Sequence, residues 1–266
     1  MLSDGATRIL AISVLVLLAV GLVSWILNVY RKSSYTLAQF PLYMLNLFLT
    51  RVLWRATVRG RLLLPKDQGA VIVCNHVGPI DPGFIALACD RPVHWMVARE
   101  YCLHPAVAWA FRILEAIPVG RAGIDTAATK LAMRYARQGH LVGMFPEGRV
   151  NNTNQLLLPG RPGAAMVALK ARVPVVPCYI TGSPNDGTPF GFLLLPARTW
   201  LTVGRPIDIS EFYGHEGERG VLEELTRRLM IEIAKLAGVE DYEPKLAGRR
   251  WKPGMEQEEP TAGNAS

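Results

Sequence analysis

The chain opens with a long uninterrupted run of apolar residues. From Ile9 to Tyr30 there is no charged residue, and a helix of about 22 residues at roughly 1.5 Å per residue reaches about 33 Å. That length is enough to cross a hydrocarbon core of about 30 Å. Trp25 and Tyr30 lie near its end, where amphipathic rings favour the membrane interface, and Arg31 and Lys32 follow at once. The pattern predicts a transmembrane helix over residues 9–30.

Two other interpretations of this segment stay open. It could be a signal peptide cleaved at the small residues Ala19, Val20 and Gly21. Against this, the apolar run continues past those residues and exceeds the usual length of about 7–15 residues. A buried core helix is the second alternative. We favour the membrane anchor over both.

A second apolar stretch runs from Phe40 to Trp54 and ends beside Arg51 and Arg55. At about 15 residues it is short for a span, which favours an interfacial helix over residues 40–54 that lies in the membrane surface. An ordinary core helix is the alternative. Only Arg8 precedes the first span, whereas several basic residues follow it, so the positive-inside rule predicts a single pass with the following chain on the cytoplasmic side.

The middle of the chain alternates short apolar runs, typical of buried strands, with longer segments of helical periodicity. The expected strands are Ala70–Cys74, Val93–Ala98, Leu141–Phe145, Val175–Ile180 and Thr199–Val203. The expected helices are Pro82–Cys89, Pro105–Glu115, Asp125–Gln138, Pro162–Ala171 and Val221–Leu236. This alternation predicts an α/β fold with a mainly parallel sheet flanked by helices, and a site beyond the carboxyl ends of the strands.

We divide the 266 residues into a membrane anchor (1–55), a globular domain (56–238) and a polar, disordered tail (239–266). The net charge is +7, and the acidic tail leaves +9 on residues 1–238, which suits an anionic lipid surface. Zinc-finger spacing and nucleic-acid motifs are absent from the sequence, so nucleic acid is not an expected partner. The four cysteines are scattered, which favours a reducing compartment.

The first candidate for chemistry follows the strand Ala70–Cys74. His76 leaves that strand, and Asp81 comes five positions later, directly before a proline. Asp81 could simply cap the next helix, because Asp followed by Pro is a common helix start. A loop imidazole has no comparable packing reason. A carboxylate folded back onto the ring would fix its tautomer and leave the other nitrogen free as a general base.

Charged residues also follow three other apolar runs. Glu147, Gly148 and Arg149 come after the strand that begins at Leu141, and Arg99 and Arg121 end two further runs. If the sheet is parallel, these arginines gather near the His–Asp pair as an anion pocket, because the guanidinium fork suits phosphate. A capping role for Glu147 and a solvated Arg149 are the simpler alternatives.

Four segments in order then resemble the motif blocks of the PlsC-like glycerolipid acyltransferases, which include 1-acylglycerol-3-phosphate acyltransferase. They are Asn75-His76-x4-Asp81, Pro118-Val119-Gly120-Arg121, Phe145-Pro146-Glu147-Gly148 and Val173-Pro174-Val175-Val176-Pro177, and the segment 159–170 is also similar. The resemblance covers roughly residues 57–205. It departs in one place, since Arg149 directly follows Gly148 where many members have threonine before the arginine.

The resemblance implies that His76 is the base that deprotonates the acceptor hydroxyl and that Asp81 orients it. The hydroxyl oxygen then attacks the thioester of acyl-CoA or acyl carrier protein, most simply converting 1-acylglycerol 3-phosphate to phosphatidate, with no metal or other cofactor. We assign substrate binding to Asn75, Arg99, Arg121, Glu147, Gly148 and Arg149, and the acyl-side pocket to Pro174 and Pro177. A membrane-tethered hydrolase and a non-catalytic lipid-binding protein are the alternatives. Membrane lipids and the acyl donor are the expected partners.

Overall fold

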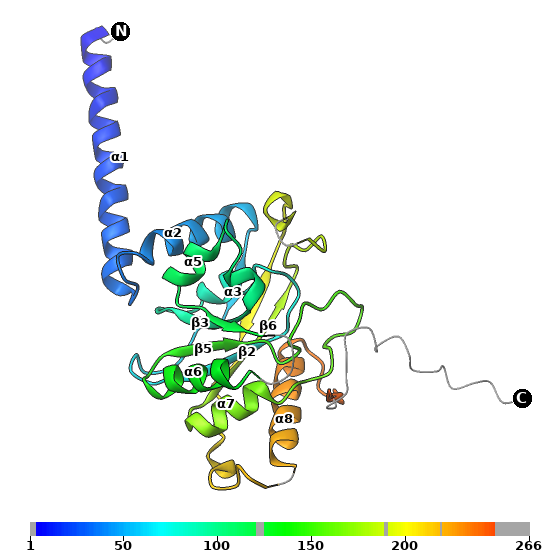
Figure 1. The fold of residues 1–266 in the computed structure, drawn as a ribbon. Helices are drawn as coiled ribbons and strands as arrows, with labels where there is room; N and C mark the ends of the chain where they lie inside the picture. Colours follow the sequence, from blue (N-terminus) through cyan, green and yellow to red (C-terminus); the bar gives the residue numbers. More distant parts are fainter. Residues whose placement is uncertain (1–3, 121–124, 189–190, 219, 248–266) are drawn as a thin grey trace, which may run out of the picture.

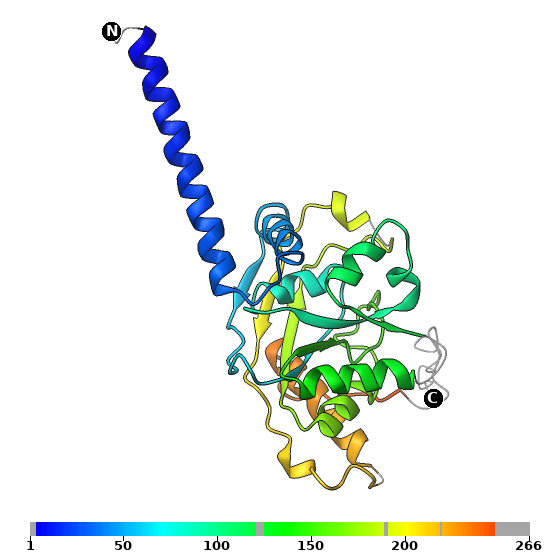
Figure 2. The ribbon, with the colours of Figure 1, turned by 60° about the vertical axis from the view of Figure 1, so that its left-hand side comes forward.

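The computed structural model of the chain describes residues 4–120, 125–188, 191–218 and 220–247. These residues form a seven-stranded sheet with helices on both faces, and a long N-terminal helix stands away from it (Figures 1 and 2). The predicted α/β class is confirmed.

The strands lie in the order β1-β7-β6-β2-β5-β3-β4. They are β1 (Thr57–Arg59), β2 (Ala70–Cys74), β3 (Val93–Ala98), β4 (Ile117–Val119), β5 (Leu141–Met144), β6 (Val175–Thr181) and β7 (Trp200–Val203). Strands β2 to β6 run parallel, β7 is antiparallel to β6, and β1 is parallel to β7. The carboxyl ends of the five parallel strands therefore share one edge of the sheet.

The helices cover the two faces of this sheet. They are α1 (Asp4–Lys32), α2 (Phe40–Phe48), α3 (Asp81–Ala86), α4 (Arg99–Cys102), α5 (Ala108–Ile113), α6 (Thr126–Arg137), α7 (Gly163–Ala171) and α8 (Val221–Leu236), with the π turn η1 (Leu49–Leu53) and the 3₁₀ turns η2 (Gly191–Leu194) and η3 (Ser210–Phe212). Helices α6, α7 and α8 lie on one face, and α2 and α3 lie on the other (Figure 1).

The central strand β2 is buried on both faces. Val71 and Val73 pack on the side of α7 and α8, whereas Ile72 packs with Trp54 and Phe84 on the other side. A strand covered on both faces has no solvent side, so its sequence reads as a continuous apolar run. This burial holds the start of the following loop rigidly in place.

Helix α1 is, among the described residues, the one helix long and apolar enough to cross a membrane, and its apolar stretch is exposed along its length. It ends against the domain, where the Tyr30 ring lies edge-on to Phe40 at a centroid distance of 4.9 Å. The stretch 40–54 has one side packed on the domain and one side exposed. Phe40, Thr50 and Trp54 are buried against the domain, whereas Leu45, at 54% exposure, faces outward.

The predicted disorder of the tail from Val239 is wrong up to Ala247. The segment after α8 pairs with Gly160, whose N–H donates to the Lys245 carbonyl at 2.8 Å and whose carbonyl accepts from the Ala247 N–H at 2.9 Å. Arg227 also donates to the Pro244 carbonyl at 3.0 Å. The polar side chains of this segment do not predict the pairing, because the hydrogen bonds join backbone groups. The rest of the tail, 248–266, lies outside the described residues.

Candidate active site

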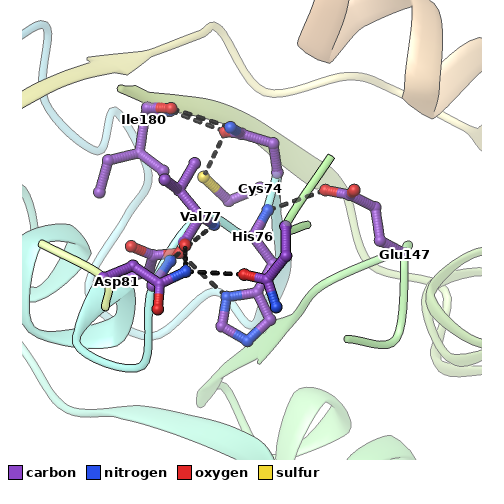
Figure 3. A network of polar contacts seen from close by, with 10 residues as sticks. Cys74, His76, Val77, Asp81, Glu147 and Ile180 are labelled. Carbon is purple, nitrogen blue, oxygen red and sulfur yellow. Dashed lines mark hydrogen bonds and ion pairs between the residues drawn. The ribbon is translucent and has the colours of Figure 1, made fainter. Parts of the chain in front are cut away.

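The loop between β2 and α3 brings His76 and Asp81 together, as the sequence predicts. His76 Nδ1 lies 2.9 Å from Asp81 Oδ2, and the same oxygen accepts from the backbone N–H groups of Val77 (2.7 Å) and Gly78 (2.9 Å) (Figure 3). An ionised carboxylate can only accept, so Nδ1 carries the proton and Nε2 keeps its lone pair. The imidazole is thereby held as a potential base.

Asp81 does not occupy the N-cap position of α3, which is the simpler prediction for this residue. It is the first residue of α3, preceded by Ile80 at the cap position, and its carboxylate points back into the loop rather than along the helix. Asp81 is completely buried, whereas the His76 side chain keeps 16% exposure. The acid is therefore sealed beneath the loop and the ring reaches the surface, an arrangement that suits a base and its orienting group.

The His76 ring is also clamped from one side. It stacks on Phe145 with ring centroids 3.8 Å apart and planes 5° apart, and Phe145 stacks in turn on Trp95 at 4.8 Å. Trp95 can take this place because Gly143, on the neighbouring strand β5, has no side chain, and a Cβ there would overlap the indole. Because Phe145 covers one face of the imidazole, the ring cannot tilt toward that side.

We expect Phe145→Leu to lower kcat by roughly 2- to 10-fold with little change in KM, because an aromatic pair contributes about 0.5–1.5 kcal/mol. Steady-state kinetics of the purified protein measure this. Phe212→Leu is the matched control, since that buried phenyl ring lies on η3 beneath Arg228. Equal kcat values for the two variants would show that the stack does not orient the base.

Asn75 does not face the site, contrary to its predicted place among the substrate-binding residues. Its amide nitrogen donates to the Ile180 carbonyl and its amide oxygen accepts from the Ile180 N–H, both at 2.8 Å. The side chain thus extends the β2–β6 pairing beyond Cys74, and it is only 4% exposed. Asn75 fixes the point at which the chain leaves the sheet.

Glu147 lies next to His76, but it binds the backbone and not the ring. Its Oε1 accepts from the His76 N–H and its Oε2 accepts from the Leu158 N–H, both at 2.8 Å, and the side chain is fully buried (Figure 3). Burial raises the pKa of Glu147 to about 8, against the opposite effect of the two N–H donors and of Arg149. Glu147 therefore joins the loops after β2 and β5 beneath the site.

The raised pKa of Glu147 makes the folded protein less stable as the pH rises. The folded chain holds this proton up to about pH 8, whereas an ordinary Glu releases it near pH 4.5, so raising the pH between these values favours the unfolded state. We expect the free energy of unfolding of the parent to fall over this range by more than that of Glu147→Gln. Denaturant titrations in detergent measure it, and parallel curves for the two proteins would contradict the assignment.

The loop after β5 brings two guanidinium groups close together. Gly148 adopts φ +72°, the left-handed region that favours glycine, and a Cβ there would come within 3.0 Å of Arg161 Cδ. Burial and the neighbouring charge of Arg161 both lower the pKa of Arg149, while Glu147 acts in the opposite direction. Arg149 and the Arg161 side chain next to Gly148 thus bring two cationic groups into the same loop after β5.

Of the other two predicted arginines, the structure describes only Arg99, which is paired with an acid. Arg99 follows β3, two strands from β2 in the sheet, and its guanidinium pairs with Asp125 at 3.1 Å. Asp125 also caps α6 by accepting from the Ala128 N–H. Arg121 lies outside the described residues.

The two prolines predicted for the acyl-side pocket, Pro174 and Pro177, lie away from the loops around His76. Pro174 precedes β6, and its carbonyl accepts from the Val71 N–H, so it lies at the amino edge of the sheet, opposite His76. Pro177 lies within β6 and contacts Gly204. Neither residue lies in the loops that surround His76, because the motif that carries them builds strand β6.

Sequence reasoning missed several residues that shape the site. Trp95 fits a buried strand, and Phe145 and Arg161 belong to segments that resemble the family, but the sequence assigns none of the three a place at the site. Asn185, in the loop after β6, donates to the Val77 carbonyl and to Asn152 Oδ1, both at 2.8 Å. The loops after β2, β5 and β6 therefore meet around His76.

Comparison with known proteins assigns this arrangement to a family. Residues 55–181 match the model of the Acyltransferase family, which covers β1 through β6 and both sides of the His76 site. Residues 55–181 are an acyltransferase-family domain. The match includes His76, Asp81 and Glu147, and the enzyme class is that of O-acyltransferases.

Individual relatives agree with the acyltransferase domain. The 1-acyl-sn-glycerol-3-phosphate acyltransferase of Bacillus subtilis is 26% identical over 174 residues, covering 65% of this chain and 83% of the relative. An uncharacterized protein of Mycobacterium tuberculosis is 31% identical over 201 residues, but the chain spans only 54% of its length. The crystal structure of PlsC from Thermotoga maritima, an LPA acyltransferase, has the same fold, with a TM-score of 0.57 at 23% identity over 78% of this chain and 83% of that one.

Proposed function

We propose that this protein transfers a fatty acyl group from acyl-CoA or acyl carrier protein to the free hydroxyl of a lysophospholipid. The observation that carries the proposal is the His76–Asp81 pair, which presents a partly exposed imidazole within an acyltransferase-family domain. A lipid-binding protein without catalysis has no need of a buried carboxylate aimed at a surface imidazole. The reaction belongs to phospholipid biosynthesis.

The mechanism follows from the protonation state of the ring. Nε2 of His76 removes the proton of the acceptor hydroxyl, and Asp81 stabilises the imidazolium through the 2.9 Å contact with Nδ1. The acceptor oxygen attacks the thioester carbonyl, the bond from that carbon to sulfur breaks, and the imidazolium returns the proton to the leaving thiol. The products are a diacyl phospholipid and a free thiol, with no cofactor required beyond the acyl donor as co-substrate.

The acceptor's headgroup is proposed to bind at Arg149 and Arg161. Both belong to loops anchored around Gly148, and their mutual repulsion is relieved by a phosphate, which two guanidinium forks can bind. Arg121, by the family resemblance, and Arg99 are further candidates for this anion. We infer that 1-acylglycerol 3-phosphate is the acceptor, as the name of the Bacillus relative states for that protein.

The proposed substrates are lipids, which fits an anchored enzyme. We propose that α1 crosses the membrane once, with the domain on the cytoplasmic face, as the flanking basic residues predict. Deleting residues 1–32 is expected to release the domain from membranes during a high-salt wash, as fractionation and immunoblotting would show. Full retention would instead show that residues 40–54 or another apolar surface of the domain hold the membrane more strongly than α1.

A product assay tests the reaction itself. The purified protein is incubated with mixed acyl thioesters and a panel of lysolipids, and the lipids are analysed by mass spectrometry. The proposal predicts a diacyl phospholipid formed in equal amount to free thiol, with lysophosphatidate as the preferred acceptor. Free fatty acid in place of a diacyl product would identify a hydrolase, and no turnover at all would favour the binding protein.

A further inference from the structure

The segment between β3 and β4 exposes two large apolar side chains. Leu103, in the turn between α4 and α5, is 71% exposed, and Trp109 on α5 is 53% exposed. They lie six residues apart, Leu103 directly after α4 and Trp109 within α5, and these two short helices contact each other. Large apolar side chains exposed close together in the chain are typical of a contact surface. We call Leu103 and Trp109 the α4–α5 patch.

The Trp109 side chain does not need water as a hydrogen-bond partner. Its single polar atom, Nε1, donates to the Ala106 carbonyl at 3.0 Å, within its own turn. The indole can leave water without losing a hydrogen bond, because its partner moves with it. In contrast to a tryptophan that needs water at its N–H, this side chain can insert into a lipid surface.

Helix α2 and the following turn η1 offer a second apolar surface. Three exposed side chains, Leu45 and Phe48 on α2 and Val52 on η1, recur at the spacing of one helical face. The start of α2 is fixed to the domain, since Gln39, at its N-cap, donates to the Ile113 carbonyl at the end of α5. The start of α2 therefore lies at the end of α5, and both helices are on the side of the domain from which α1 rises (Figure 1). A bilayer crossed by α1 meets both helices.

We propose that the α4–α5 patch docks into the same lipid bilayer as α1, as a second contact separate from the N-terminal segment. The proposal rests on the membrane anchoring proposed above. Helix α4 begins at the carboxyl end of β3, on the sheet edge where His76 leaves β2, so docking turns this edge toward the lipid phase. The acceptor then reaches the site without crossing bulk water.

Apolar insertion, not charge, drives this contact. From Arg99 to Glu115 the segment carries two arginines and two glutamates, and one of these arginines, Arg99, is paired with Asp125. A charge-neutral segment gains nothing from anionic headgroups. The docking is therefore expected to be equally deep in vesicles of phosphatidylcholine and in vesicles that also contain phosphatidylglycerol.

Quenching of tryptophan fluorescence by brominated lipid tests the proposal on the full chain in vesicles. The contribution of Trp109 is the emission lost in Trp109→Phe, a variant outside the catalytic and binding residues. We expect brominated lipid to cause a roughly twofold or greater loss of that contribution, because an interfacial apolar face reaches about 5–10 Å into the acyl boundary. An equal contribution in brominated and plain vesicles overturns the docking.

Two controls fix the reference points. Trp25, within α1, is read in the same way from Trp25→Phe and reports on the anchor alone. Leu63→Trp places a reporter at a side chain of similar exposure, 56%, near Pro174 at the amino edge of the sheet. Quenching of Trp25 without Trp109 overturns the docking and leaves the anchor in place, and an unquenched Trp25 refutes the anchor separately. Quenching at position 63 as strong as at Trp109 also contradicts a specific patch.

Discussion

Replacing His76 by Ala is expected to lower kcat by about 10²–10⁴, the usual contribution of a positioned general base. The imidazole is partly exposed, its Nδ1 faces the buried Asp81, and Phe145 covers one of its faces, so its remaining nitrogen is the group available for proton transfer. The fold should survive, since Glu147 binds the backbone of residue 76 and not the ring.

Steady-state acyl transfer to a lysolipid measures this loss. His215→Ala is the matched control, because that ring is exposed on the domain surface and pairs with Glu218. The control should keep the parent's kcat. A His76→Ala variant within threefold of the parent would remove His76 from the mechanism.

Asp81→Asn is expected to lower kcat by roughly 10- to 100-fold, because a hydrogen bond to a charged partner contributes about 1.5–3 kcal/mol. In the transition state the imidazolium loses its anionic neighbour, while the amide oxygen still accepts from the loop. Oδ1 of Asp81 is buried with no hydrogen-bond partner within the described part of the chain, so an amide nitrogen placed there breaks no existing bond but leaves its own N–H groups without an acceptor.

The pattern of kinetic constants separates orientation from folding. Asp81→Asn should keep the parent's KM while kcat falls, and it should lower the thermal unfolding midpoint less than Asp81→Ala does. Asp81→Ala, which leaves the N–H groups of Val77 and Gly78 without their acceptor, should lower the unfolding midpoint as well. An Asn variant with full kcat would show that the carboxylate is only a structural part of the loop.

The sequence located the His–Asp pair because its geometry is local. Five positions separate the two residues, and a loop that leaves a buried strand has few ways to fold. The direction of the Asp81 carboxylate was less certain, since capping a helix and accepting from the preceding loop both use short-range N–H donors. In the structure Asp81 Oδ2 accepts from the N–H groups of Val77 and Gly78 and contacts His76 Nδ1, so the carboxylate serves the loop.

Residues whose partners lie far along the chain could not be assigned. Asn75 and Glu147 stand at strand ends, where polar side chains often face substrate, yet their partners are the backbone groups of Ile180 and Leu158. A period-two pattern does not reveal that Phe145 supports an imidazole, because the same residue fits a buried strand. Arg161 is held at the site by its backbone N–H, which donates to the Pro146 carbonyl at 2.8 Å, and by the pairing of the neighbouring Gly160 with residues 245–247.

The central claim is that the acceptor, activated by His76, attacks the thioester directly. Rapid-quench measurement of thiol release, with protein in excess of acyl thioester, tests it most directly. The account predicts release only when a lysolipid is present, in equal amount to the diacyl product, and its loss in His76→Ala. A stoichiometric burst of thiol without acceptor, accompanied by a protein whose mass has gained one acyl group, would contradict it.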